Sequence, residues 1–154
     1  MKLSKASSFA LYAVLELAAN SGRALSGTDI AAKYRISAHH LAKVLRELGR
    51  ARIVEAARGV GGGYRLVANP KRLTLLDVIQ IFEPVGSEDE VTGYPERATD
   101  AERALGMVLA ELDKHTIATF RSITISTILK LMARKPWDNV EQSPRAIQKA
   151  VSRP

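Results

Sequence analysis

The sequence predicts a mainly α-helical protein with one small β-hairpin. Along the 154-residue chain, apolar residues recur at steps of three and four, which is the periodicity of helices that bury one face. Serine or threonine precedes several of these segments, as helix N-caps do. Two short runs of β-forming residues, 52–57 and 63–67, flank a cluster of glycines, and this arrangement is typical of a hairpin.

Three helices are expected before the hairpin. Ser7 and Ser8 are placed to cap the first, and Ser26 the second, which is about two turns long. Ser37 is placed to cap the third, over residues 38–51, whose apolar residues recur at helical spacing. Because only a brief turn separates the second helix from the third, the two are predicted to form a helix-turn-helix.

The glycine cluster lies in the stretch RGVGGGYRL, residues 58–66. A dinucleotide-binding fingerprint would place its third glycine where Tyr64 stands, and a P-loop would end in Gly-Lys followed by Ser or Thr. Neither pattern is present, so the glycines are interpreted as the tip of a β-hairpin, where they permit positive φ. A hairpin directly after a helix-turn-helix makes a winged helix.

Positive charge is concentrated in the first half of the chain. The formal net charge is +7; residues 1–72 hold 13 Lys and Arg against 4 Asp and Glu, a balance of +9, and residues 73–154 hold 10 against 12, a balance of −2. This asymmetry predicts a polyanionic partner for the first half. The basic residues are spread over several short elements rather than one amphipathic helix, which favours nucleic acid over a membrane surface.

The outward face of the predicted third helix and the hairpin supply the candidate contacts with nucleic acid. The helix face is long, polar and mostly cationic, which suits a DNA major groove, although a merely solvated surface is the alternative. Arg58 stands at the base of the hairpin tip, where arginine suits a narrow minor groove better than lysine does; the alternative is a surface arginine on a flexible turn. The helix face carries His39, His40, Lys43, Arg46, Glu47 and Arg50.

A long helix is expected from Thr99, its N-cap, to about Phe120. Its apolar seam follows steps of four, three and four and extends to a histidine, which is the spacing that pairs helices in coiled coils. We therefore expect this helix to join two copies of the chain, with packing against its own domain as the alternative. A shorter helix follows, capped by Thr124 and ended by Pro136. The seam residues are Ala101, Leu105, Val108, Leu112 and His115.

Composition excludes or disfavours several chemistries. The chain contains no cysteine, which excludes disulfides, cysteine nucleophiles, thiolate zinc sites and all-thiolate iron-sulfur clusters. It has no catalytic triad order, metalloprotease motif or nucleotide loop, so an enzyme is not expected. The acidic run 88–90 is interpreted as a solvated loop rather than a metal site, and no cofactor is expected. No window approaches the roughly 20 apolar residues of a membrane span, so we expect a cytoplasmic protein without membrane contact.

Over roughly residues 1–133 the chain resembles the Rrf2 superfamily of bacterial transcription regulators, which includes IscR, NsrR and CymR. The N-terminal MKLSKASSFALYAVLELA, the helix-turn-helix segments DIAAKYRIS and LAKVLRELGRARIV, the wing RGVGGGYRL and the following LTLLDVIQIFEP match in order and spacing. The resemblance implies a homodimer on a pseudo-palindromic operator in double-stranded DNA, with the third helix in the major groove and the wing arginine in the minor groove. We expect it to act as a repressor.

Together the residue pattern and the resemblance assign DNA binding to one set of side chains and argue against a cluster. In cluster-binding members of the family, three cysteines follow the helix that here is 75–83, and the last, with its histidine, falls on Arg103 and Gly106; an NsrR-type aspartate ligand falls on Ser8. A small-molecule effector or a partner protein stays open as the signal. The DNA-binding residues are Ser37, His39, His40, Lys43, Arg46, Arg50, Arg58, Gly59, Gly61 and Tyr64, with Ala42 also facing the groove.

The expected organisation has four parts. A winged helix-turn-helix DNA-binding domain covers residues 1–83, a loop covers 84–98, a dimerisation helix and the following short helix cover 99–134, and a C-terminal tail covers 135–154. The alternative class is a protein-interaction module or co-regulator that binds a partner enzyme. That class accounts for the long helix but leaves the charge of the first half and the hairpin unexplained.

Overall fold

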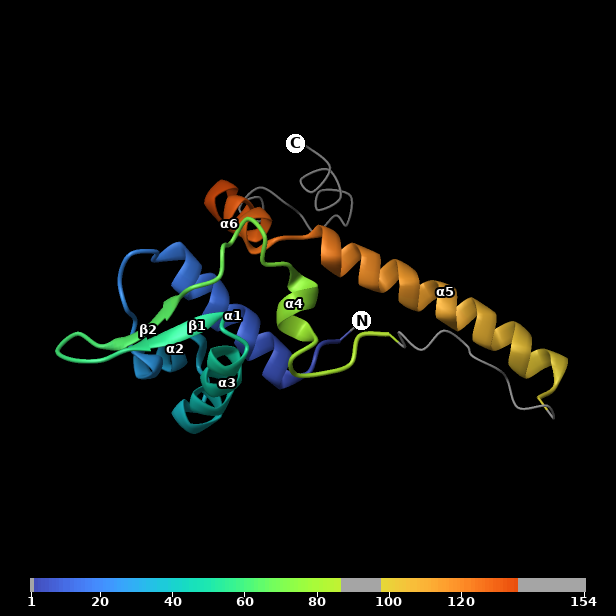
Figure 1. Cartoon of the computed structure of the whole chain (residues 1–154), viewed down its shortest axis with the longest axis horizontal. Helices are drawn as coiled ribbons and strands as arrows, with labels where there is room; N and C mark the ends of the chain where they lie inside the picture. The colour runs from blue at the N-terminus through green and yellow to red at the C-terminus, as the bar shows by residue number, and fades with distance from the viewer. Residues whose placement is uncertain (1, 87–97, 136–154) are drawn as a thin grey trace.

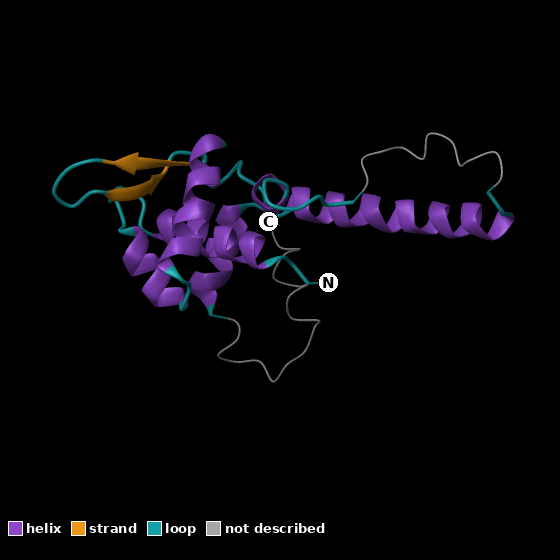
Figure 2. Cartoon of the chain, turned by 90° about the horizontal axis from the view of Figure 1, so that it is seen from below, coloured by secondary structure: helices purple, strands orange, loops and turns teal. Residues whose placement is uncertain are grey.

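The computed structural model describes residues 2–86 and 98–135. A β-hairpin and a long helix project in opposite directions from a body of helices (Figure 1, Figure 2). The mainly helical fold class with one antiparallel hairpin is confirmed. The described elements are α1 (Lys5–Ala19), α2 (Gly27–Tyr34), α3 (Ala38–Arg50), β1 (Val54–Ala57), β2 (Gly63–Leu66), α4 (Leu75–Ile79), α5 (Asp100–Ser122) and α6 (Ile125–Arg134).

The first helix begins earlier than the sequence predicted. Its N-cap is Ser4, whose hydroxyl oxygen accepts a hydrogen bond from the Ser7 amide at 3.1 Å. The prediction that Ser7 and Ser8 cap this helix is wrong, because Ser7 is fully buried in the first turn and the Ser8 hydroxyl donates to the Ser4 carbonyl at 2.9 Å. The Ser4 amide donates to the Glu83 carboxylate at 3.0 Å, so a residue distant in sequence helps to fix where the helix starts.

The other predicted caps lie where expected. Ser26, Thr99 and Thr124 are N-caps whose side chains accept hydrogen bonds from backbone amides. Ser37 is the N-cap residue of α3, but its side chain makes no capping hydrogen bond. Pro136, predicted to end the last helix, lies outside the described residues.

The core is built around α1, which contacts α2, α3, α4, α6 and β2. Its residues Ala10, Ala13 and Val14 are completely buried. Ile125, the first residue of α6, belongs to the same core, and its amide donates to the Leu73 carbonyl at 2.8 Å. The last described helix therefore returns to the body that the first three helices form (Figure 1).

The hairpin is bonded to the helix-turn-helix. In the antiparallel pair, Val54 lies opposite Leu66 and Ala57 opposite Gly63. On its other edge, β2 exchanges backbone hydrogen bonds of 2.8 and 2.9 Å between Tyr64 and Leu25, just before α2. Hairpin and helices thus share one hydrogen-bonded framework.

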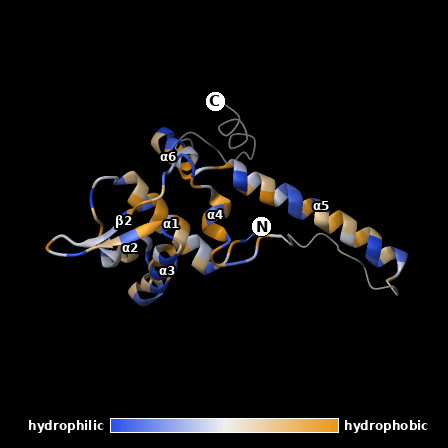
Figure 3. Ribbon diagram, in the orientation of Figure 1, coloured by the Kyte–Doolittle hydropathy of each residue, from blue (hydrophilic) through white to orange (hydrophobic). Residues whose placement is uncertain are grey.

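The long helix α5 stands largely clear of the body. It begins with a capping box between Thr99 and Glu102, and none of its residues is buried. It contacts α4, and a Cβ added at Gly86 would meet the side chains of Asp113 and Ile117. Figure 3 shows hydrophobic segments along the part that projects from the body. No helix of the described ranges combines the length and the apolar character that crossing a membrane requires.

Candidate nucleic-acid interface

Helix α3 has one buried face and one exposed face, as its periodicity predicted. Leu41, Val44, Leu45 and Leu48 are buried against α1 and α2. Helix α3 lies on the side of the body away from α6 (Figure 1). Because the buried set fixes the helix's rotation, the polar set has to face solvent. The exposed residues of this face are Ser37, His39, His40, Ala42, Lys43, Arg46 and Arg50.

The N-terminus of α3 is open toward solvent. The Ser37 hydroxyl makes no capping hydrogen bond, and the first turn contains no acidic residue. The first amides of a helix have no partners inside it, and its dipole favours negative charge at this end. This end is therefore suited to a phosphate oxygen, with the hydroxyl of Ser37 and the rings of His39 and His40 beside it.

The cations of α3 differ in how far they are already neutralised. Arg50 donates from Nη1 to both carboxylate oxygens of Glu47, at 2.9 and 3.1 Å. Neither Lys43 nor Arg46 forms an ion pair with any of residues 2–86 and 98–135. The two unpaired cations thus carry the net positive charge of this face. The i,i+3 spacing of Glu47 and Arg50 was the signal for their pairing.

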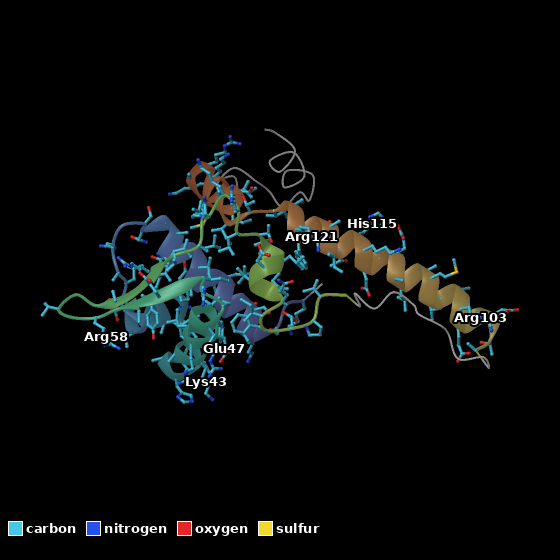
Figure 4. All side chains as sticks on the ribbon, viewed as in Figure 1. Lys43, Glu47, Arg58, Arg103, His115 and Arg121 are labelled. Atoms are coloured by element: carbon cyan, nitrogen blue, oxygen red, sulfur yellow. The ribbon has the colours of Figure 1, made fainter. Side chains whose placement is uncertain are left out.

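The hairpin brings a third exposed cation to the same side of the molecule. Figure 4 shows Lys43 on α3 and Arg58 on the hairpin directed to one side of the body. Arg58 forms no ion pair within the described part of the chain, whereas Arg65 on the same hairpin is paired with Glu55. Gly59 and Gly61 have positive φ, 102° and 78°, which L-residues with side chains rarely adopt. They provide the tight turn that the sequence predicted.

Tyr64 lies at the junction of hairpin and helices rather than at the tip. Its ring lies beside Gly27, the first residue of α2, at a point also close to the Leu45 side chain of α3. The neighbouring Gly63 packs so closely that an added Cβ would overlap the Leu25 carbonyl oxygen. The aromatic ring therefore sets the position of the hairpin relative to α3.

A buried carboxylate joins α1 to α2, and the sequence analysis did not identify it. Glu16 accepts from Lys33 Nζ at 2.7 and 2.8 Å and from the Tyr34 hydroxyl at 2.8 Å. Burial opposes the charge of Glu16, yet hydrogen bonds from Lys33, Tyr34 and Asn20 outweigh it and lower its pKa. Burial and the hydrogen bond to Glu16 raise the pKa of Tyr34 to about 12. The signal was a single acidic residue in the apolar segment 9–19 of α1.

The predicted seam of α5 is exposed. Leu105, Val108 and Leu112 are 60%, 58% and 57% exposed, and Ala101 and His115 are exposed as well. His115 Nε2 lies 3.4 Å from the Glu111 carboxylate. The structure thus brings the seam residues together on one helix, but no element of the described chain covers them.

Comparison with known proteins gives a consistent identification. A family model described as "Rrf2: Iron-dependent Transcriptional regulator" matches residues 3–131. A Rhodopseudomonas palustris protein named as the HTH-type transcriptional regulator BadM is 49% identical over 132 residues, covering 86% of this chain and 83% of its own. The HTH-type transcriptional regulator NsrR of Geobacillus kaustophilus is 31% identical over 129 residues, covering 77% of this chain and 88% of its own.

Solved structures agree with the fold. CymR (YrzC), the global cysteine regulator of B. subtilis, superposes with a TM-score of 0.70 at 26% identity, over 84% of this chain and 97% of its own. T. potens IscR superposes with a TM-score of 0.66 at 22% identity, over 93% of this chain and 94% of its own, a likeness of fold. The relatives and the fold are those of transcriptional regulators, not of enzymes.

The residues present do not fit the iron group that the family description names. Thiolate ligands are absent from the entire sequence. At the positions matched to cluster ligands, α5 carries Arg103 and Gly106, and the Ser8 hydroxyl is bonded to the Ser4 carbonyl. Within the described ranges, no group of three or more His, Asp or Glu side chains is arranged to hold a metal ion. The acidic run 88–90 lies outside those ranges.

Proposed function

The chain belongs to the Rrf2 family of transcriptional regulators, and from this membership we propose that it binds a pseudo-palindromic operator as a homodimer and represses transcription. One observation carries the proposal. Lys43 and Arg46 on α3 and Arg58 on the hairpin are exposed cations without ion-pair partners among the described residues. Exposed, unneutralised cations on a helix and a neighbouring wing are suited to a DNA duplex.

In the proposed complex, α3 lies in the major groove. Lys43 and Arg46 reach base edges or phosphates from the middle of the helix. The amides of the open helix N-terminus at Ser37 donate to a phosphate of the DNA backbone. The wing places Arg58 over the adjacent minor groove, where its planar guanidinium meets a narrow, strongly negative channel. Gly59 and Gly61 contribute bare backbone there, and Tyr64 acts by positioning the wing.

Arg50 has a smaller expected role than Lys43 and Arg46. Its guanidinium is held by Glu47, so a phosphate contact would have to compete with an existing ion pair. Replacing the Glu47 carboxylate by a phosphate as the partner of Arg50 contributes less binding free energy than a phosphate contact made by an unpaired cation. We therefore place the principal α3 contacts on the two unpaired cations.

The homodimer is proposed from the exposed seam of α5. Because each helical residue turns by about 100°, the seam from Ala101 to His115 occupies a sector of about 80°. Ile117, which faces Gly86 and the body, lies outside this sector. One face of α5 thus contacts its own domain, while a second, apolar face is left for another copy. A pair of copies presents two α3–wing units to two half-sites, as a pseudo-palindrome requires.

The experiment is selection of bound genomic fragments with the purified full chain across a salt series, followed by footprinting. We expect a protected pseudo-palindrome whose affinity falls steeply with salt, because released counterions drive binding. Transcription from a promoter that contains this site is then measured with and without the protein, and a decrease is expected. Weak, sequence-blind binding across all fragments would contradict the operator proposal, and an increase in transcription would contradict repression.

The signal to which the regulator responds is proposed to act without a cluster. Since the residues at the family's cluster positions are not metal ligands, we propose a small-molecule effector or a partner protein. Footprinting is carried out with cell extract and with the same extract after filtration has removed its proteins. An effect that survives filtration indicates a small molecule, and an effect that filtration abolishes indicates a partner protein. Loss of operator binding on addition of an iron chelator to the purified protein would contradict this proposal.

A further inference from the structure

The tip of the hairpin presents a valine to solvent. Val60 is completely exposed, whereas the other described valines are at least partly covered. Its two neighbours, Gly59 and Gly61, take the positive φ values of the turn, and Val60 does not. The β-branched residue therefore sits at the apex in an ordinary backbone conformation, with bare backbone on both sides.

The apex rests on a well-bonded base. The Gly62 amide donates to the Gly59 carbonyl at 2.9 Å, which closes the turn directly below Val60. Farther down, Glu55 and Arg65 are paired across the strands, and Leu25 is bonded to β2. An apolar side chain held on such a projection gains no burial within the described chain. It gains burial only from a surface that the hairpin enters.

This inference rests on the proposed function. We propose that Val60 is a specificity-determining residue that enters the minor groove beside Arg58 and selects A·T over G·C base pairs there. In the minor groove, A·T and T·A pairs present only acceptor atoms, while G·C adds the exocyclic amino group of guanine. Arg58 can donate to those acceptors. Valine has no acceptor for the guanine amino group, so burying that group against its methyl groups leaves a donor unsatisfied.

The test uses three duplexes of the selected operator that differ only at the base pairs under the wing: A·T, G·C and inosine·C. Inosine lacks the amino group of guanine but keeps the major-groove edge of a G·C pair, so it isolates readout from the minor groove. We expect the wild-type protein to bind the A·T and inosine·C duplexes about tenfold more tightly than the G·C duplex.

Two variants assign this discrimination to the side chain. Val60→Thr keeps the shape and β-branching but adds a hydroxyl that accepts from the guanine amino group, and we expect its preference to fall to about twofold. Val60→Gly removes the side chain, and we expect the same loss of preference. Val67→Thr, at an exposed valine beyond the strand, is the matched control and should keep the wild-type preference.

Each outcome decides the inference. Equal wild-type affinity for the three duplexes overturns it, and so does an unchanged preference in Val60→Gly. In either case specific operator binding with a salt-dependent affinity leaves the proposed function intact. Failure to bind any operator specifically overturns both.

Discussion

The carboxylate of Glu16 connects two helices of the body, α1 and α2. Both of its oxygens accept from Lys33 Nζ, and Oε2 also accepts from the Tyr34 hydroxyl. The Tyr34 ring stacks on Tyr12 with centroids 5.0 Å apart. A buried carboxylate is costly when unpaired, but here each oxygen has a donor. This residue therefore fixes α2, and with it the helix-turn-helix, against α1.

Glu16→Gln is expected to lower the free energy of unfolding by about 1–3 kcal/mol at pH 7, because the neutral amide leaves Lys33 without its counter-charge. The folded-state pKa of Glu16 is depressed, so its contribution is present above the ordinary carboxyl pKa and is lost as pH falls through the lowered value. Urea unfolding at one protein concentration, at pH 7 and at pH 3, measures both effects. Glu55→Gln, at an exposed ion pair, should change stability by less than about 1 kcal/mol.

If the free energies of unfolding of wild type and Glu16→Gln differ by the same amount at pH 7 and at pH 3, the stabilisation does not come from the ionised carboxylate.

Arg58→Ala should weaken operator binding by about 1–3 kcal/mol if the guanidinium enters the minor groove. The salt dependence of binding should also become shallower, because fewer counterions are released. Binding isotherms at several salt concentrations provide both quantities. Arg134→Ala, at an exposed arginine of α6, is the control, and an equal loss in the two variants would exclude the wing contact.

Most helix caps and helix faces were predictable from the sequence, whereas contacts between elements far apart in the chain were not. The caps at Ser26, Thr99 and Thr124 and the buried stripe of α3 depend on residues within a turn or two, so local patterns identified them. The start of α1 is set by Ser4, a cap as local as the others, which the neighbouring Ser7 and Ser8 obscured, and it is reinforced by Glu83. The edge of β2 depends on Leu25. Neither Glu83 nor Leu25 is near its partner in sequence, and no local pattern encodes such a contact.

The residues of the candidate interface also fall into a group that local sequence patterns predicted and a group that they did not. The exposed face of α3 and the turn at Gly61 followed from periodicity and composition. That Arg50 is neutralised by Glu47 was readable from their spacing. The packing of Tyr64 at the junction of wing and helices could not be predicted, because an aromatic residue after a glycine run is as compatible with an exposed position as with a packed one.

Gly63→Ala is expected to disturb the wing more than Gly59→Ala does. Gly59 has open space around it, so alanine there costs only the strain of positive φ, about 1–2 kcal/mol. At Gly63 the added methyl group collides with the Leu25 carbonyl and must break the backbone pairing of β2. Urea unfolding and footprinting compare the two variants. Equal stability, or an unchanged minor-groove footprint in Gly63→Ala, would show that the hairpin tolerates loss of this pairing.

The molecule presents two surfaces of unlike chemistry. The body carries the exposed, unpaired cations Lys43, Arg46 and Arg58, and the projecting helix α5 carries a row of apolar residues that no described element covers. Burial of several leucine-sized side chains is worth a few kcal/mol in total even when partial. In the proposed dimer this burial holds together two bodies that do not otherwise need to touch.

Leu105→Asp should convert the proposed dimer to a monomer at micromolar concentration, because a carboxylate would be buried without a partner within the seam. Met107→Asp is the matched control, since Met107 is also exposed on α5 but lies about 120° from the middle of the seam. Sedimentation equilibrium gives the mass of each variant. A Leu105→Asp protein that stays dimeric, or a Met107→Asp protein that dissociates equally, would place the interface elsewhere.

The bonds between Leu25 and Tyr64 have a consequence for how a signal can be transmitted. They tie the wing directly to the residue that precedes α2, so the hydrogen bonds oppose a change of angle between the two parts of the proposed interface. In the proposed dimer, an effector that leaves these bonds intact would alter operator affinity by changing the distance or the tilt between the two α3–wing units. In such a mechanism the spacing between half-sites, rather than the sequence of either half-site, is the property of DNA that distinguishes the active from the inactive regulator.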